Sequence, residues 1–194
     1  MVKIKKDTYN DVAKLHIHSI KTGFLPTLGL DFLALMYRCL DESNSTILIT
    51  EYNNDKLTGF VSGSLGKSSP YRLMFSHPFL LARSLFPILL SPIKLKKVYS
   101  ILRHMSGSER SQYPQAELLT ICINLDFRRQ GVGKRLYNEL MRYMKSNSVD
   151  NFSIIVGEHL DANNFYVNNG ARVTGNIEVH VGSKSFVYIQ KVKY

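Results

Sequence analysis

The chain has 194 residues, 44% of them hydrophobic, which is enough for one well-buried core and short for two, so we expect a single domain over residues 1–194. Its formal net charge of +10 predicts an anionic partner, without choosing among nucleic acid, a membrane surface and a polyphosphate cofactor. Cys39 and Cys122 lack metal-ligand spacing, so we expect buried thiols without a disulfide or a metal site, in a cytoplasmic protein. No apolar run reaches the ~18 residues of a membrane span, so we expect a soluble protein without a spanning helix.

Periodicity and turn residues predict five elements in the first 65 residues. In chain order they are a strand, two helices and the two strands of a hairpin, at residues 2–4, 10–19, 31–40, 45–52 and 57–65. The hairpin turn contains Asn53, Asn54 and Asp55, residue types that favour tight turns.

The segment 67–115 differs from the rest of the chain in composition. It contains eight Lys or Arg residues and one acid, Glu109, together with five of the six prolines. We interpret it as a basic insertion of short helices broken at Pro78, Pro87 and Pro92.

The C-terminal part begins with a nearly continuous apolar run at residues 117–125, which predicts a central strand covered on both faces. The apolar residues of the following helix recur every four positions, at Val132, Leu136, Leu140 and Met144. The remaining elements are a strand, a short helix and a hairpin, at residues 152–156, 161–168, 177–181 and 185–192. These elements predict a mixed α/β fold with a helical insertion before the central strand.

The stretch FRRQGVGKRL, residues 127–136, joins the central strand to that helix. Lys134 and Arg135 stand in the first helical turn, where the helix dipole disfavours cations, so a bound anion would stabilise them. Gly131 and Gly133 have no side chains to keep phosphate oxygens from the backbone N–H groups. We therefore predict phosphate binding, the alternative being a solvated basic turn.

Two common phosphate-binding motifs do not match this loop. In a Walker A loop a glycine would stand in place of Arg128, and in the dinucleotide fingerprint a glycine would replace Leu136. The pattern that fits is Arg-x-x-Gly-x-Gly, from Arg128 to Gly133, between a buried strand and a helix. With it, residues 116–170 resemble the GNAT superfamily of N-acetyltransferases.

A second block of residues supports the resemblance. The family carries a helix segment whose pattern is matched here by Ala162, Phe165, Tyr166 and Gly170. The chain departs from that pattern where His159 replaces an asparagine and Ala171 replaces a phenylalanine. The resemblance implies the GNAT fold, a twisted mixed sheet flanked by helices.

The resemblance also implies acetyl-CoA as the cofactor, with its pyrophosphate at the loop and its pantetheine arm along the central strand. The implied cofactor-binding residues are Ile121, Cys122, Ile123, Arg128, Arg129, Gln130, Gly131, Val132, Gly133, Lys134, Arg135, Asn163, Phe165 and Tyr166.

Three residues acquire roles in the reaction from the resemblance. Tyr166 would protonate the departing thiolate, and the Ile123 N–H would donate to the thioester carbonyl. Glu117 matches the general base of the histone acetyltransferases in this superfamily, and it would deprotonate an amine whose ordinary pKa is ~10.4. The alternatives are a packing role for Tyr166 and an exposed strand-end carboxylate for Glu117.

The resemblance thus implies an N-acetyltransferase that moves an acetyl group to a primary amine by direct attack. It also implies that residues 21–29, the basic insertion and residues 178–185 shape the acceptor pocket, and the charge of the insertion favours a small anionic amine such as a nucleotide-linked amino sugar. Peptide or protein amines stay open, as does a non-catalytic CoA-binding or membrane-surface role. We prefer a lid to a membrane contact for the insertion, and we expect no nucleic-acid partner and a monomer or homodimer.

Overall fold

The computed structural model describes residues 8–20, 25–67, 72–89, 112–180 and 183–192. The strand predicted at residues 2–4 and the predicted break at Pro92 lie outside these residues. The strands are β1 (Thr46–Asn53), β2 (Lys56–Ser64), β3 (Glu117–Ile123), β4 (Asn151–Gly157), β5 (Arg172–His180) and β6 (Ser183–Lys191). The α-helices are α1 (Thr8–Ser19), α2 (Leu30–Glu42), α3 (Pro78–Leu89), α5 (Val132–Ser146) and α6 (Ala162–Asn168), and short 3-10 turns are η1 (Leu25–Leu28), η2 (Arg72–Ser76) and η4 (Leu125–Phe127).

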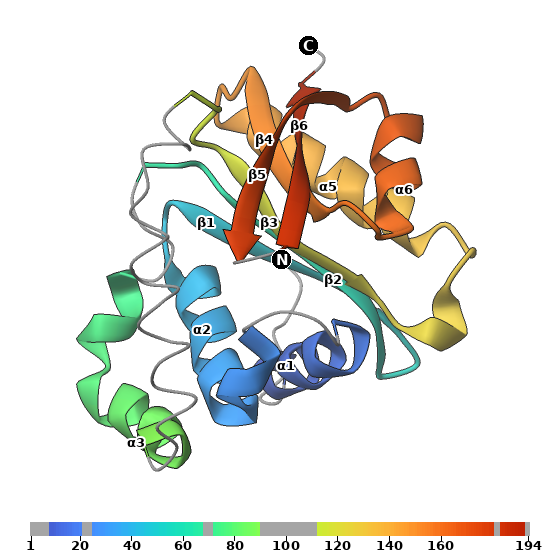
Figure 1. Ribbon diagram of the computed structural model, residues 1–194. Coiled ribbons are helices and arrows are strands. Elements are labelled where there is room, and N and C mark those ends of the chain that lie inside the picture. The colour runs from blue at the N-terminus through green and yellow to red at the C-terminus, as the bar shows by residue number, and fades with distance from the viewer. Residues whose placement is uncertain (1–7, 21–24, 68–71, 90–111, 181–182, 193–194) are drawn as a thin grey trace.

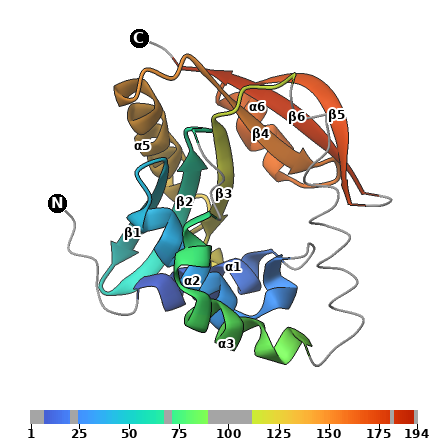
Figure 2. The same ribbon diagram turned by 90° about the vertical axis from the view of Figure 1, so that its left-hand side faces the viewer.

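The strands form one six-stranded sheet in the order β1-β2-β3-β4-β6-β5. β3 and β4 run parallel, whereas every other neighbouring pair is antiparallel. Figures 1 and 2 show α1, α2 and α3 gathered on one side of this sheet and α5 and α6 on the other. The predicted mixed α/β fold is therefore confirmed.

Each face of the sheet has its own hydrophobic core. On the α5 side, the predicted stripe of α5 is buried, with Val132, Leu136, Leu140 and Met144 at most 3% exposed. The other core joins the sheet to α1 and α2 and contains Cys122 of β3, whereas Leu118 of β3 belongs to the α5 core. β3 is thus covered on both faces, as its apolar sequence predicts.

A buried polar pair lies in the core on the α1 and α2 side. His16 is 2% exposed, and its Nδ1 atom is 2.5 Å from the Tyr37 hydroxyl of α2. Burial disfavours the imidazolium form and lowers the pKa of His16 to about 4. His18 is exposed on another side of α1.

Three expectations about the basic segment and the last hairpin are wrong. Pro87 does not break a helix but lies in the last turn of α3, where few hydrogen bonds remain to be lost. Pro78, in contrast, does separate two helical turns, because η2 ends at Ser76 and Pro78 begins α3, a position that proline favours. β5 begins at Arg172 rather than at residue 177, because a register shift between Val173 and Gly175 interrupts the alternation that would reveal a strand. β6 begins at Ser183, so Ser183 and Lys184 belong to the strand and not to the turn. Within the described residues, no helix has the length and apolar character to cross a membrane.

Candidate active site

β3 and β4 begin side by side and then part. The parallel ladder between them contains only Glu117 with Ser153 and Leu118 with Ile154. β3 stays paired to β2 as far as Ile123, and β4 stays paired to β6 along its whole length. In the described part of the chain, the β4-facing edge of β3 therefore has no strand partner beyond Leu118, and an extended ligand can pair with it.

The parting coincides with a β-bulge in the ladder between β2 and β3. Ser62 pairs with Thr120 and Gly63 with Leu118, so Leu119 has no residue opposite it. A bulge bends and twists its strand, which turns the rest of β3 away from β4. The three strand residues predicted to contact the cofactor lie beyond this bulge: Ile121, Cys122 and Ile123.

The direction of the backbone groups on the parted edge follows from one hydrogen bond. The Asn124 N–H donates to the Thr58 carbonyl of β2 at 2.8 Å. Because backbone groups alternate in direction along an antiparallel strand, the N–H and C=O of Ile123 point to the opposite, unpaired edge. The Ile123 N–H therefore points away from β2, and its role as a donor to the thioester carbonyl stays a prediction.

The loop after β3 is held in place by its own contacts. The Asn124 side chain accepts a hydrogen bond from the Asp126 N–H at 3.2 Å, and Lys56 Nζ lies 2.5 Å from an Asp126 carboxylate oxygen. The Gln130 side chain donates to the Asp126 carbonyl at 2.9 Å. These contacts shape the loop before any ligand binds, which lowers the entropy that binding must overcome.

The start of α5 presents backbone donors. Gly131 adopts a left-handed conformation with φ 77°, which favours glycine, and it gives the helix no side-chain cap. The N–H groups of the first helical residues, beginning with Val132 and Gly133, therefore lack intrahelical acceptors. A Cβ atom added at Gly133 would come no closer than 3.6 Å to its nearest neighbour, a Phe165 ring atom, so the fold itself does not require glycine there. A ligand that approaches this backbone does require it.

The four cations of the loop differ in their partners. The side chains of Arg128, Arg129 and Lys134 are exposed and form no ion pair with a described residue. Arg135 instead contacts Glu51 of β1, with Nη2 2.6 Å and Nε 3.2 Å from the two carboxylate oxygens. The charge of Arg135 is thus already balanced within the protein, and its role in phosphate binding stays a prediction, as do the roles of the other three cations.

Tyr166 lies on α6 among aromatic rings beside the parted strands. Its side chain is 4% exposed, and its ring centroid lies 5.3 Å from that of Phe165, 6.0 Å from Tyr188 and 6.2 Å from Tyr137. Its hydroxyl makes no hydrogen bond to any residue that the structure describes. Burial, with smaller effects from Tyr137 and Cys122, raises the pKa of Tyr166 well above its usual range. The hydroxyl therefore keeps its proton at neutral pH, but the raised pKa also makes it a weaker acid, and its role as the catalytic acid stays a prediction.

Asn163 fastens α6 to the end of β4. Its amide nitrogen lies 2.8 to 3.0 Å from the carbonyl oxygens of Gly157, Glu158 and Leu160, and its amide oxygen accepts a hydrogen bond from the Tyr188 hydroxyl at 2.8 Å. The predicted cofactor contact of Asn163 stays a prediction, because the described contacts engage its side chain within the protein. Sequence reasoning missed Tyr188, whose partner lies 25 residues away in the chain.

Glu117 lies at the closed end of the parted strands. It is partly buried and pairs with Ser153 at the start of β4. Since Leu118 packs in the α5 core, strand alternation directs Glu117 toward the face covered by α1 and α2. Six residues separate Glu117 from Ile123, which corresponds to ~20 Å along the strand. Its predicted role as general base stays a prediction.

Both cysteines of the chain are buried free thiols. Burial raises the pKa of each, and that of Cys122 reaches about 12. Neither forms an appreciable amount of thiolate at neutral pH, so neither supplies a thiolate nucleophile.

Comparison with known proteins gives a consistent result. The chain matches the model of the acetyltransferase (GNAT) family over residues 17–171. A search of curated proteins found no significant match. At the low sequence identities that follow, similarity to solved structures shows the fold alone.

Three solved structures illustrate that similarity. An aminoglycoside 6'-N-acetyltransferase complexed with coenzyme A superposes with a TM-score of 0.63 at 13% identity, over 100% of this chain and 96% of that chain. The PaiA N-acetyltransferase of Thermoplasma acidophilum, also complexed with coenzyme A, gives 0.61 at 14% identity, over 97% and 96%. The ribosomal-protein-S18-alanine N-acetyltransferase of Escherichia coli gives 0.57 at 10% identity, over 98% and 92%.

Proposed function

The chain belongs to the acetyltransferase (GNAT) family, which makes it an acyltransferase, and from that premise we propose that it moves the acetyl group of acetyl-CoA to a primary amine by direct attack. The observation that carries this proposal is the uncapped start of α5 beside the unpaired edge of β3. A ligand with a pyrophosphate at one end and an amide-containing arm suits both features, because helix starts bind phosphate and strand edges pair with extended chains.

The residues of the loop fit the diphosphate group. The bare backbone at Gly133 leaves room for phosphate oxygens, and the first-turn N–H groups of α5 supply donors without a competing side-chain cap. Arg128, Arg129 and Lys134 bring exposed positive charge to the same loop. The arm would then lie along Ile121 to Ile123.

The transfer itself needs three proton or charge adjustments from the protein. Acetyl-CoA supplies a thioester carbonyl, and attack by the amine nitrogen forms a C–N bond while the C–S bond breaks. The Ile123 N–H would stabilise the negative charge that develops on the carbonyl oxygen. Tyr166 would give its proton to the departing sulfur. Because Glu117 lies ~20 Å along β3 from Ile123, it would accept the amine proton only through a chain of water molecules.

The state of the cysteines supports direct attack over a covalent acyl-enzyme. Transfer through cysteine would need a thiolate, and burial keeps Cys39 and Cys122 protonated. We therefore propose that the amine attacks the thioester itself.

For the acceptor we propose a small anionic amine such as a nucleotide-linked amino sugar. The support is the basic segment 67–115, although only part of it and of the other predicted pocket segments is described. A peptide or protein amine is the second candidate, since one protein of this fold acts on a ribosomal-protein alanine. A panel of amino-sugar nucleotides, polyamines and peptides, assayed by thiol release, separates them: acetylation of polyamines without the sugar nucleotides would refute the anionic acceptor.

The donor site is tested by calorimetric titration of acetyl-CoA into the wild type, Gly133→Asp and Asn138→Asp. Gly133→Asp places a carboxylate among the phosphate donors without using a left-handed backbone position, so folding should survive. Asn138→Asp adds the same charge on an exposed later turn of α5. We expect binding by the wild type and the control, and at least ~30-fold weaker binding by Gly133→Asp. Equal binding by all three proteins would place the donor elsewhere.

A further inference from the structure

The segment formed by η2 and α3 exposes large apolar side chains. Phe75, Phe79 and Phe86 are 74%, 78% and 61% exposed, and Leu80 is 40% exposed. Among the residues that the structure describes, these four make up half of the strongly exposed large apolar side chains. Clustered exposure of this kind marks an interaction surface more often than chance scatter does.

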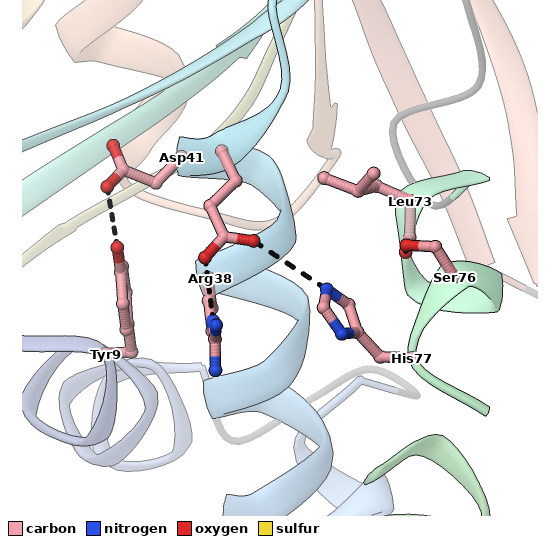
Figure 3. Close-up of polar contacts among 7 residues, drawn as sticks. Tyr9, Arg38, Asp41, Leu73, Ser76 and His77 are labelled. Atoms are coloured by element: carbon pink, nitrogen blue, oxygen red, sulfur yellow. Dashed lines mark hydrogen bonds and ion pairs between the residues drawn. The ribbon is translucent and has the colours of Figure 1, made fainter. Parts of the chain in front are cut away.

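The opposite side of the same segment is packed against the protein. Met74 and Ser84 are 3% and 5% exposed, and Leu81 contacts the core formed by α1 and α2. His77 Nε2 lies 3.7 Å from a Glu42 carboxylate oxygen at the end of α2. Figure 3 shows the His77 side chain directed toward α2. The exposed phenyl rings are therefore presented by an attached helix.

The sidedness of α3 follows from helical spacing. Phe79, Arg83 and Phe86 are separated by four and three residues, so they lie on one side, while Leu81 and Ser84 lie on the other. We call the exposed set the α3 face and define it as Phe75, Phe79, Leu80, Arg83 and Phe86.

Charge selects among the surfaces that could cover the α3 face. Arg83 lies between the two phenylalanines of the helix, and the sequence from Lys67 to Ser108 contains seven Lys or Arg residues and no acid. Two copies of the chain meeting through this face would bring like charges together, whereas an anionic surface would neutralise them. Lipid headgroups also accept phenyl rings without a shaped pocket.

We propose that the α3 face binds an anionic lipid surface, with Phe79 and Phe86 entering the interface and Arg83 contacting lipid phosphate. This proposal differs from the lid that we prefer from the sequence, which would bury these rings and which stays a prediction. The binding is peripheral and reversible, since one short helix face buries little area.

Flotation with vesicles tests this inference independently of acetyl transfer. The full chain is mixed with vesicles of phosphatidylcholine alone or of phosphatidylcholine with phosphatidylglycerol. We expect binding only to the anionic vesicles, decreasing as salt is added. Phe79→Ser with Phe86→Ser should lower the partition coefficient at least ~tenfold, and Arg83→Glu should lower it ~tenfold.

A matched control uses exposed valines elsewhere. Val167 and Val173 are 53% and 51% exposed on α6 and β5, so Val167→Ser with Val173→Ser removes exposed apolar groups outside the α3 face and should leave vesicle binding unchanged. Thermal melts establish whether each variant folds. If the phenylalanine variant does not fold, Arg83→Glu, a change at an exposed residue, still tests the inference. No wild-type binding to anionic vesicles, or equal binding by the α3-face variants, would overturn the inference. So would a wild-type dimer that the phenylalanine variant dissociates while neither binds lipid.

Discussion

His16 and Tyr166 are buried titratable side chains on opposite faces of the sheet, and they differ in whether their polar atoms have a hydrogen-bond partner within the protein. On the α1 and α2 side, His16 meets the Tyr37 hydroxyl at 2.5 Å inside a closed core. On the α5 side, Tyr166 is similarly buried, yet its hydroxyl has no hydrogen-bond partner among the described residues. Burial shifts the pKa of both groups toward the neutral form.

The difference separates structural from functional polar groups. The Tyr166 hydroxyl oxygen is not one of the fully buried, unpartnered side-chain atoms of the described residues, so it keeps access to solvent, which a bound ligand can displace. A satisfied pair such as His16 with Tyr37 stabilises the core. We therefore expect changes on the two faces to affect different quantities, activity on one and stability on the other.

The largest expected effect is on activity, from Tyr166→Phe. Loss of the acid should lower kcat by ~10²–10⁴-fold, while the affinity for acetyl-CoA stays within about twofold because the ring remains. Stability should be unchanged or slightly higher, because no protein hydrogen bond is removed. Thiol-release kinetics with the acceptor found in the amine panel, together with urea unfolding, measure both quantities.

Tyr137→Phe is the matched control for that experiment. Its hydroxyl donates to Gln190 at 2.9 Å in the same core, so its loss should cost about 1–3 kcal/mol of stability. If Tyr166→Phe instead lowered stability and left kcat unchanged, Tyr166 would be a packing residue. The distinction between a structural His16 and a functional Tyr166 would then be wrong.

The next effect is on stability alone and depends on pH. The imidazole of His16 binds a proton below its usual pKa of 6.5 in the unfolded chain, but only below about 4 in the folded protein. The unfolded state therefore holds more protons between these values, so this group lowers the free energy of unfolding as pH falls from 6.5 to 4, by about 3 kcal/mol in total. Above pH 6.5 its contribution is constant.

His16→Asn should flatten this part of the stability profile. Urea unfolding of both proteins at several pH values between 7 and 4 gives the difference directly, since the remaining titrations are shared. Parallel profiles would mean that His16 is protonated in the folded core, and its pairing with Tyr37 would have to be reconsidered.

The features predicted from sequence are those set by local spacing. Val132, Leu136, Leu140 and Met144 repeat at helical spacing, and all four are buried. Other features depend on residues far apart in the chain. The bulge that leaves Leu119 unpaired exists only in the ladder between β2 and β3, and a sequence does not reveal which strands pair.

The candidate site divides in the same way. The loop motif contains both glycines: Gly131 adopts a left-handed backbone conformation, and Gly133 is bare where we propose that the diphosphate binds, although the fold itself leaves room there for a side chain. The carboxylate that binds Arg135 belongs to Glu51, 84 residues earlier, and no local sequence pattern predicts this contact. Local patterns thus predict the glycine-containing loop, whereas contacts with residues far away in the chain determine which of its cations are paired within the protein.

A smaller effect on activity is expected from Tyr188→Phe. The Tyr188 hydroxyl holds Asn163, and Asn163 holds the start of α6, so its loss should loosen the placement of Tyr166. We expect kcat to fall by ~tenfold with the KM for acetyl-CoA nearly unchanged. Tyr143→Phe is the control, because that hydroxyl donates to the Thr46 carbonyl away from α6. A fall in acetyl-CoA affinity without a fall in kcat would contradict a positioning role and favour a direct cofactor contact of Asn163.

The smallest expected effect concerns the donor site itself. It tests whether a cation that is already paired within the protein contributes to acetyl-CoA binding. Lys134 and Arg135 are neighbours in the first turn of α5, but of the two only Arg135 forms an ion pair with a described residue, Glu51. Lys134→Gln should therefore weaken acetyl-CoA binding by ~three- to fivefold, and Arg135→Gln by less than about twofold. Glu51→Gln should tighten binding slightly by releasing the guanidinium toward the phosphates. Calorimetry at low salt resolves these differences in acetyl-CoA affinity. A larger loss of affinity from Arg135→Gln than from Lys134→Gln would show that the guanidinium leaves Glu51 when acetyl-CoA binds. Pairing in the free protein would then no longer indicate that a group is structural.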